Sequence, residues 1–449
     1  MKADMKSDCC ICSPTGVRIV LTFAAMFGWK IRRDDALTAF LQTGQAQRAV
    51  YVVPPKECRD RRFLWLLLAA VYGLVNSNAK WQVQSDDVIL SIGLVQSKYI
   101  PQLFYKFNNG RIVLVVAKIV DDLMVSGEPD EADLFEKKFG ARFKLGCSAS
   151  GPGQFQFFGL TIKQNEDLSS TIDGDDKLSA LEGYPLTRSR RRQNDDPMND
   201  LEKSSFMSVN SSIGWLGLTA SPLCAFYASY LQQQLPTNTV SCLTLQARCL
   251  NLLKRFGSTV SYPQPPQKQD FTMNVCVFAD AGRQCDHGQL SYVCGLLLGP
   301  LEKGSTFYTL SWMSHKSRRP VKSVAAAEIL AVGEAIDEGK MAKFALQDML
   351  KIDVHLIVVT DSKDLYNSLS TQRNATDRSV RADVNVCRFD FETKAFDQLV
   401  WIPGRTNLAD PGTKRDSALS EALQLLLYNG KIPIDLSEAE ARSSSRPLG

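Results

Sequence analysis

Two adjacent aspartates, Asp121 and Asp122, have the setting in this chain that most clearly suggests chemistry. They follow an apolar run at 112–120 that is rich in β-branched residues, and a second apolar segment at 123–125 comes directly after them. Such runs are typical of strands, so the pattern predicts a hairpin that holds both carboxylates at or near its turn. Neighbouring carboxylates repel, and a hard divalent cation such as Mg²⁺, which takes oxygen ligands, relieves that repulsion. An ordinary acidic turn is the alternative, because aspartate is common in turns.

Four further carboxylates stand out in the C-terminal half. Asp280 and Asp361 each follow a short apolar strand pattern, and Asp410 lies beyond a third. Glu328 lies near the start of an apolar helical pattern, where a lone carboxylate is costly unless it is paired or binds a metal. The polarity of a helix N-terminus also favours an acid there, which gives Glu328 a structural alternative. Converging on one strand edge, the four could hold two metal ions that clamp an in-line phosphoryl displacement.

The composition is that of an ordinary globular chain. Its 449 residues suggest two or three domains, and its net charge of +4 permits a polyanionic partner without requiring one. The longest uncharged apolar stretch, 63–75, is too short to span a bilayer, and the N-terminus lacks the apolar core of a signal peptide. We therefore expect an intracellular protein, cytoplasmic or nuclear, that is not secreted.

Histidine and cysteine contribute little to the expected chemistry. The chain has 3 histidines, so catalysis would have to rely on carboxylates. Its 12 cysteines are scattered, and the cluster of Cys9, Cys10 and Cys12 has no second pair or histidine at zinc-ligand spacing, which disfavours a zinc site.

The hydrophobic pattern predicts elements in two regions. The N-terminal ones are a helix at 14–29, a strand or turn carrying Asp34 and Asp35, a strand at 50–53, a largely helical stretch at 63–92, a helix at 130–143 and a strand at 154–164. The C-terminal ones are helices at 201–256, strands at 272–279, 290–298 and 306–312, a helix at 324–350, and strands at 354–360 and 399–402.

Two polar segments separate these elements. The stretch 173–200 contains four arginines between 188 and 192, and it is either a solvated linker or a loop that contacts phosphates. The proline-rich segment 262–267 is a stiff linker and the clearest domain boundary.

The C-terminal acids lie in motifs that resemble a retroelement ribonuclease H. The contexts are Phe-Ala-Asp-Ala-Gly, Ala-Ala-Glu-Ile-Leu-Ala, Val-Thr-Asp-Ser and Asn-Leu-Ala-Asp-Pro-Gly-Thr-Lys, and residues 311–316 resemble the Ser-Trp-x-Ser-x-Lys strand of the copia group. The resemblance implies a nuclease that cleaves the RNA strand of RNA–DNA hybrids, with Lys316 as a substrate contact. Its implied catalytic residues and metal ligands are Asp280, Glu328, Asp361 and Asp410.

The N-terminal part resembles a copia-type reverse transcriptase. The matching motifs are Asp-Ala-Leu-Thr-Ala-Phe-Leu at 35–41, Tyr-Val-Val-Pro-Pro at 51–55, Val-Tyr-Gly-Leu at 71–74 with Trp81, Val-Asp-Asp at 120–122, and Phe-Gly-Leu at 158–160. Overall the chain resembles a fragment of a copia-type LTR retrotransposon polyprotein, over roughly residues 13 to 430.

The resemblance also implies roles in the palm. Asp35 and Asp121 would be metal ligands, and Asp122 would be a third catalytic acid. Phe40 would be a steric gate against a ribose 2′-hydroxyl, although a core aromatic is its alternative, and Tyr72 and Gly73 would bind the template. Implied cofactors and partners are two Mg²⁺ or Mn²⁺ ions per active site, an RNA template and deoxynucleotides.

The expected fold is an α+β palm with thumb-like helices, followed by an α/β ribonuclease H-like domain. The expected limits are a tail at 1–12, the palm at 13–165, a linker with thumb- or connection-like helices at 166–262, a proline-rich linker at 263–269, the ribonuclease H-like domain at 270–430 and a tail at 431–449.

Some features depart from the family. Residues 75–80 differ from the family's template motif, Ile119 replaces an aromatic residue, and no fingers segment precedes the palm. We therefore expect weak DNA synthesis. A decayed nucleic-acid-binding relic, or a chain in which only the nuclease is active, is the competing hypothesis. A host ribonuclease H with an unrelated N-terminal domain does not account for Asp35, Phe40, Asp121 and Asp122 together.

Overall fold

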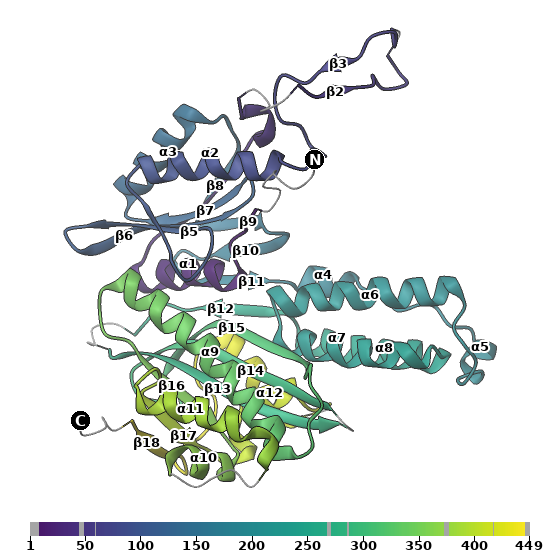
Figure 1. The fold of residues 1–449 in the computed structure, drawn as a ribbon, viewed down its shortest axis with the longest axis vertical. Coiled ribbons are helices and arrows are strands. Elements are labelled where there is room, and N and C mark those ends of the chain that lie inside the picture. The colour runs from purple at the N-terminus through teal and green to yellow at the C-terminus, as the bar shows by residue number, and fades with distance from the viewer. Residues whose placement is uncertain are drawn as a thin grey trace. The chain divides into compact units, whose positions relative to one another are not determined.

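The computed structural model describes residues 9–44, 49–58, 60–266, 271–284, 287–371, 377–415 and 417–444 (Figure 1). The chain forms two compact units, residues 1–158 and 159–449. The proline-rich segment, expected to separate two domains, lies inside the second unit. One reason is that the helices before it join the sheet after it, since Trp312 Nε1 donates to the Gly217 carbonyl at 2.6 Å.

The first unit is built on a six-stranded sheet with the order β4-β5-β6-β7-β1-β8. Its strands are β1 (Ile31–Ala36), β4 (Val95–Gln96), β5 (Leu103–Asn108), β6 (Arg111–Ile119), β7 (Asp122–Gly127) and β8 (Leu145–Ser150). Helices α2 (Ser77–Ser91) and α3 (Pro129–Arg142) cover one face, and α1 (Pro14–Phe27) lies against β6 and β7 on the other (Figure 1). Because β6 is buried on both faces, its sequence is almost continuously apolar.

Local signals explain the first helix. The Ser13 hydroxyl accepts a hydrogen bond from the Gly16 amide at 3.3 Å, and Pro14 occupies the first turn, where its missing N–H costs nothing. Gly28 ends the helix in the left-handed conformation, with φ of 64°. The expected helix at 14–29 is therefore present, but it ends at Phe27, two residues earlier than expected.

The expected helical stretch at 63–92 is wrong in its first half. Residues 65–66 form β3 (Trp65–Leu66), which pairs with β2 (Tyr51–Val52), and the helix begins only at Ser77. Gly73 adopts a φ of +92°, which a continuous helix cannot contain. The apolar composition of this stretch suggested a helix, but its side chains, such as Phe63 and Leu68, are largely exposed.

The second unit begins with three strands and a group of helices. The strands β10 (Leu160–Gln164), β11 (Ser170–Asp173) and β12 (Thr259–Tyr262) are antiparallel neighbours. The helices are α4 (Asp175–Ala180), α5 (Arg188–Arg192), α6 (Asp200–Thr219), α7 (Pro222–Gln234) and α8 (Val240–Phe256). The helical pattern at 201–256 predicted α6, α7 and α8, whereas α4 and α5 lie in the segment that was expected to be a linker or loop. Arg190 of α5 pairs with Glu202, whose carboxylate also caps α6, so at least one arginine of the cluster is structural.

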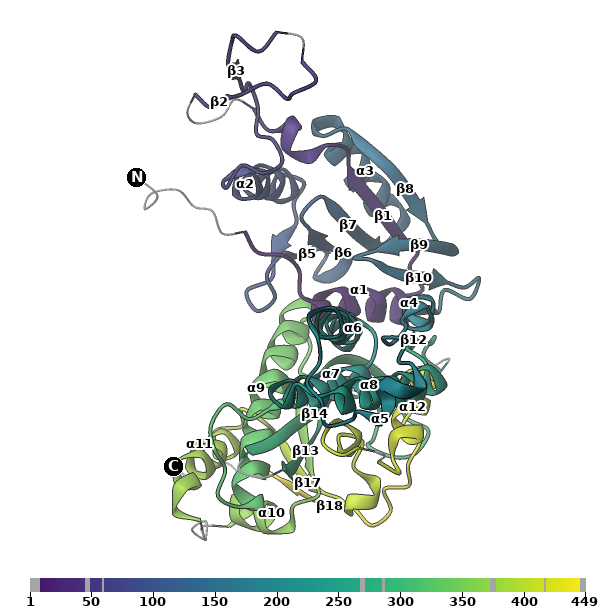
Figure 2. The same cartoon turned by 90° about the vertical axis from the view of Figure 1, so that its right-hand side faces the viewer.

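A second six-stranded sheet follows, with the order β15-β14-β13-β16-β17-β18. Its strands are β13 (Met273–Gln284), β14 (His287–Leu298), β15 (Thr306–Lys316), β16 (His355–Thr360), β17 (Gln398–Trp401) and β18 (Glu440–Ser443). Helix α9 (Val324–Leu350) packs across β13, β14 and β16, with α10 (Lys363–Ser370) and α11 (Arg381–Glu392) beside it (Figure 2). Helix α12 (Ser420–Asn429) packs on β12.

The first strand of this sheet is longer than expected. The sequence placed its end at residue 279, but β13 continues through Asp280 to Gln284 because its antiparallel partner β14 extends the ladder that far. The parallel pairing with β16 does stop at Ala279 and Thr360. Asp280 therefore lies immediately beyond the parallel part of the sheet.

Candidate active sites

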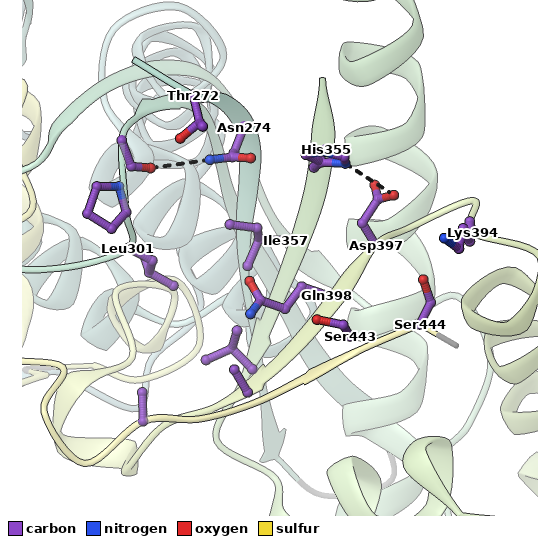
Figure 3. Close-up of a pocket in the computed structure, with 15 residues that line it drawn as sticks. Thr272, Asn274, Leu301, His355, Ile357, Lys394, Asp397, Gln398, Ser443 and Ser444 are labelled. Carbon is purple, nitrogen blue, oxygen red and sulfur yellow. Dashed lines mark hydrogen bonds and ion pairs between the residues drawn. The ribbon is translucent and has the colours of Figure 1, made fainter. Parts of the chain in front are cut away.

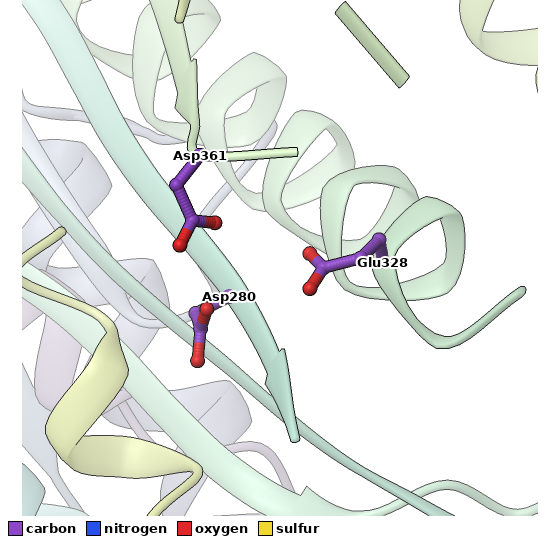
Figure 4. Close-up of side chains that lie close together, drawn as sticks. All are labelled: Asp280, Glu328 and Asp361. Carbon is purple, nitrogen blue, oxygen red and sulfur yellow. The ribbon is translucent and has the colours of Figure 1, made fainter. Parts of the chain in front are cut away.

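Three carboxylates from separate elements meet at one edge of the second sheet. Ligand oxygens of Asp280, Glu328 and Asp361 all lie within 4.8 Å of one another (Figure 4). Ala279 and Thr360, which pair in the parallel ladder, directly precede the two aspartates and so bring them side by side. Glu328 comes from the first turns of α9, whose N-terminus is capped by the Ser323 hydroxyl. We call these acids the three-carboxylate group.

Burial makes this group unusual. Burial, followed by repulsion from Asp361, raises the pKa of Asp280 to about 6, and burial with repulsion from both aspartates raises the pKa of Glu328 well above its usual value. Burial also raises the pKa of Asp361. Glu328 Oε2 is buried and has no hydrogen-bond partner among the residues that the structure describes. Three converging oxygen donors, one of them unpaired, fit a hard divalent cation.

Two neutral side chains, which the sequence reasoning did not single out, orient the group. Asn407 Nδ2 donates to Asp361 Oδ1 at 3.2 Å and to the Ala279 carbonyl at 2.8 Å. The Thr413 hydroxyl donates to Asp280 Oδ2. Both residues belong to the Asn-Leu-Ala-Asp-Pro-Gly-Thr-Lys motif, so their spacing from Asp410 was the available signal.

Asp410, the fourth acid expected at this edge, lies outside the three-carboxylate group. It begins the short 3₁₀ turn η5 (Asp410–Gly412) and is buried. Its two carboxylate oxygens accept hydrogen bonds from Lys414 Nζ and the Ser417 hydroxyl. Asp410 is close enough to affect the others, because its charge contributes to the raised pKa values of Asp280 and Asp361.

Lys316, the expected substrate contact, is the exposed last residue of β15. It lies two residues beyond Ser314, which is in register with Ser291 of β14 and, through it, with Asp280. Strand β15 therefore continues two residues past the level of Asp280, and Lys316 lies at its end. Among the described residues, Lys316 makes no ion pair with the acids.

The palm acids lie on the hairpin that the sequence predicted. Asp122 starts β7 and is the direct cross-strand partner of Asp35 on β1. Asp121 lies in the two-residue turn with Val120, which has a φ of 56°, a strained value for a β-branched residue. Trp81 Nε1 donates to the Val120 carbonyl at 2.7 Å and holds this turn against α2.

An arginine occupies part of the palm site. Arg33 donates to Asp122 Oδ1 from Nη2 at 2.5 Å and from Nε at 3.1 Å, and its Nη2 lies 3.9 Å from Asp35 Oδ1. Burial raises the pKa of Asp122 while Arg33 opposes the rise, and burial with repulsion from Asp122 and Asp35 raises that of Asp121. In the part of the chain that the structure describes, these three acids do not converge as the three-carboxylate group does.

The predicted gate residue stands beside the palm acids. The Phe40 ring is buried and packs edge-on against Tyr72, with ring centroids 4.6 Å apart. Tyr72 is largely exposed, and its pKa is raised by burial of the hydroxyl and by the nearby Asp121 and Asp35. Gly73 follows with a φ of +92°, a conformation that glycine adopts readily.

A pocket of about 610 Å³ lies elsewhere on the second sheet (Figure 3). It is lined at the start of β13 by Asn274 and at the start of β16 by His355, which pairs with Asp397. Asp280 and Asp361 follow the C-terminal ends of the paired segments of β13 and β16, whereas the pocket lies at their N-terminal ends. The pocket is therefore separate from the acidic site.

The fold and the acids together define the class of protein. Strands β15, β14 and β13 are antiparallel, β16 and β17 join β13 in parallel, and acids stand at the resulting edge, which is a ribonuclease H-like arrangement. The first unit has an antiparallel sheet with a paired-aspartate hairpin, as in a reverse transcriptase palm. The α+β fold class expected from the sequence is confirmed.

Comparison with known proteins agrees with this class. Residues 6–179 match the family described as reverse transcriptase (RNA-dependent DNA polymerase). Two relatives from Arabidopsis thaliana, the retrovirus-related Pol polyproteins from transposons RE2 and RE1, are each 33% identical over 116 residues, which is 25% of this chain and 8% of theirs. The chain thus spans a small part of the curated relatives that it matches, and the matches support the resemblance of the N-terminal part to a copia-type reverse transcriptase.

Solved structures were also found. A ribonuclease H1 isolated from compost is 18% identical, with coverage of 31% of this chain and 92% of that one and a TM-score of 0.23. The foamy viral protease-reverse transcriptase in complex with dsDNA is 14% identical, with coverage of 80% and 66% and a TM-score of 0.20. At these TM-scores the interpretation of the fold rests on the strand order itself. None of the described helices is long and apolar enough to cross a membrane.

Proposed function

We propose that this protein is a retrotransposon-type enzyme whose C-terminal site cleaves the RNA strand of RNA–DNA hybrids. The observation that carries the proposal is the three-carboxylate group, with its buried and unpaired Glu328 Oε2. Mg²⁺ or Mn²⁺ bound there would supply a nucleophilic hydroxide and stabilise the leaving oxygen of an in-line phosphoryl displacement.

The chain's own residues would prepare this site. Asp280, Glu328 and Asp361 would bind the ions, and Asn407 and Thr413 would fix the two aspartates in the required orientation. The exposed Lys316 would contact a backbone phosphate of the hybrid. Such a contact releases counterions from the nucleic acid, so binding should weaken as the salt concentration rises.

The decisive experiment compares Asp361→Asn with Asp364→Asn. Asp364 is an exposed aspartate three residues further along, in the first turn of α10, and it does not belong to the three-carboxylate group. A neutral amide at 361 would weaken metal binding. We expect the purified full-length chain and Asp364→Asn to cleave a labelled hybrid with Mg²⁺ or Mn²⁺, and Asp361→Asn to fold but not cleave. Equal cleavage by both variants would refute the assignment.

RNA-directed DNA synthesis in the palm is the second candidate function. It is supported by the pairing of Asp35 with Asp122 and by the Phe40–Tyr72 contact, which would place a gate beside an incoming deoxynucleotide. Arg33 argues for the alternative that only the nuclease is active, because it already binds Asp122. Extension of a primed RNA template that Asp121→Asn abolishes would support the polymerase. Hybrid cleavage without extension would support the alternative.

A further inference from the structure

Asp410 is the acid that the three-carboxylate group leaves out, and the turn that starts at Asp410 explains why. The amides of Thr413 and Lys414 both donate to the Asp410 carbonyl, at 3.0 and 3.2 Å. The turn thereby brings Lys414 back over the carboxylate, where Nζ binds Oδ1, while the Ser417 hydroxyl binds Oδ2. Both oxygens of a buried carboxylate are thus occupied from within the chain.

The sheet holds this turn in place. The Ser314 hydroxyl of β15 donates to the Gly412 carbonyl at 2.5 Å. A Cβ at Gly412 would collide with the side chain of Ser291 on β14. Since the backbone lies directly on the two strands, the position of Lys414 follows from the packing of the turn and not from a free surface loop.

The ammonium of Lys414 also acts on the other acids. Burial would lower the pKa of Lys414, but attraction by Asp280, Asp410 and Asp361 outweighs it and raises the pKa. In return, its charge opposes the upward pKa shifts of Asp280 and Glu328. One lysine therefore serves as a shared counter-cation for a cluster of four carboxylates.

We propose that Lys414 is a positioning residue that keeps Asp410 out of the three-carboxylate group until divalent ions replace the ammonium. The inference rests on the proposed nuclease function. A first ion would find three acids already converged. A second ion that uses Asp410 would have to displace a tethered cation, whose effective concentration at that carboxylate is high. The two metal sites should therefore differ in affinity.

Lysine suits such an exchange. Its ammonium is a compact charge on a flexible stem, and half of this side chain is exposed, so it can leave Asp410 without repacking of the core. The Ser417 hydroxyl, a neutral donor, holds the other oxygen more weakly than the ammonium holds the first, so it competes less with a metal.

Mn²⁺ titration calorimetry on the full-length, metal-free chain tests the proposal. Every sample carries Asp121→Asn, so that ions in the palm do not contribute. We expect a tight and a weaker binding step without further change. In Lys414→Gln, the affinity of the second step should rise by about tenfold. The reason is that the ammonium no longer competes with the ion for the Asp410 carboxylate. Lys414→Arg should keep the weaker step, and Ser417→Ala should tighten it less than Lys414→Gln does.

The matched control is Lys322→Gln, which removes an exposed lysine that does not contact the acids; both steps should be unchanged. An unchanged second step in Lys414→Gln and Ser417→Ala would overturn the proposal while leaving the nuclease intact. Absence of any Mn²⁺ binding that Asp361→Asn removes would instead overturn the nuclease assignment. If metal-free Lys414→Gln does not fold, the second binding step is compared between Ser417→Ala and Lys414→Arg. It should be tighter in Ser417→Ala, and equal affinities would overturn the proposal.

Discussion

A buried lysine supports the palm hairpin and yields a prediction about stability. Lys118 on β6 is only 2% exposed, and it lies three residues before Asp121. Its Nζ donates to the Ser85 hydroxyl at 2.6 Å and to Asp86 Oδ1, and both partners come from α2. Gln102 Nε2 donates to the other oxygen of Asp86 at 2.9 Å. The ion pair therefore connects β6, the strand that leads into the turn with Asp121, to helix α2.

The two partners should respond unequally to substitution. Asp86→Leu leaves an ammonium buried with one neutral acceptor, and breaking a buried pair in this way costs roughly 3–5 kcal/mol. Lys118→Met should cost less, because Asp86 is 16% exposed and keeps its bond from Gln102. The double variant, with matched apolar side chains, should recover most of the loss, since apolar replacement of a buried pair is often neutral.

Thermal unfolding with hydrogen exchange of the palm peptides measures these effects. For a unit of this size, a loss of that order corresponds to a fall in Tm of roughly 6–20 °C. Burial lowers the pKa of Lys118, although Asp86 opposes it. The folded state then binds fewer protons than the unfolded state, so the native chain should gain stability over Lys118→Met as pH rises toward the usual lysine pKa. Additive losses in the double variant would refute the reasoning.

Two further predictions concern the second unit. The hydrogen bond with Glu334 raises the pKa of His315, so its stabilisation is present below the unfolded pKa and lost as pH rises through the folded value. The stability difference between the native chain and Glu334→Gln should therefore shrink as the pH rises above the usual histidine pKa of about 6.5, and a constant difference in denaturant melts would contradict this. Asn407→Ala should weaken Mn²⁺ binding roughly 10- to 100-fold, because it frees Asp361; an unchanged affinity in calorimetry would show that the amide does not orient the carboxylate.

The sequence predicted most of the elements because burial leaves a clear pattern in them. The continuous apolar run of β6 and the helical pattern of α9 correspond to a strand and a helix with buried faces. The helix expected after residue 63 was wrong because the apolar residues of this stretch are exposed. Without a buried face, their spacing does not report a helix or a strand. The end of β13 was also misplaced, since its length is set by hydrogen bonding to the next strand, β14, and not by the apolar pattern of β13 itself.

The acids of the candidate sites were found from the sequence, but their partners were not. A motif identifies Asp410 as an acid in the right order, yet only the folded turn reveals that Lys414 and Ser417 already bind it. Likewise, Arg33 lies two residues before Asp35 in the sequence, but its bond to Asp122 depends on the register of β1 with β7. Hydrogen bonds between side chains depend on geometry that no single-sequence pattern encodes.

Both acidic sites thus contain an internal cation, and the kind of cation separates them. In the palm, Arg33 engages one oxygen of Asp122 through two N–H groups of a rigid, planar guanidinium. In the nuclease, a half-exposed lysine binds Asp410 and leaves the three-carboxylate group converged. A fixed guanidinium is harder to displace than a mobile ammonium, and among the described residues the palm acids do not form a converging group of three. We therefore expect the nuclease to reach its metal-bound state at lower metal concentrations than the palm.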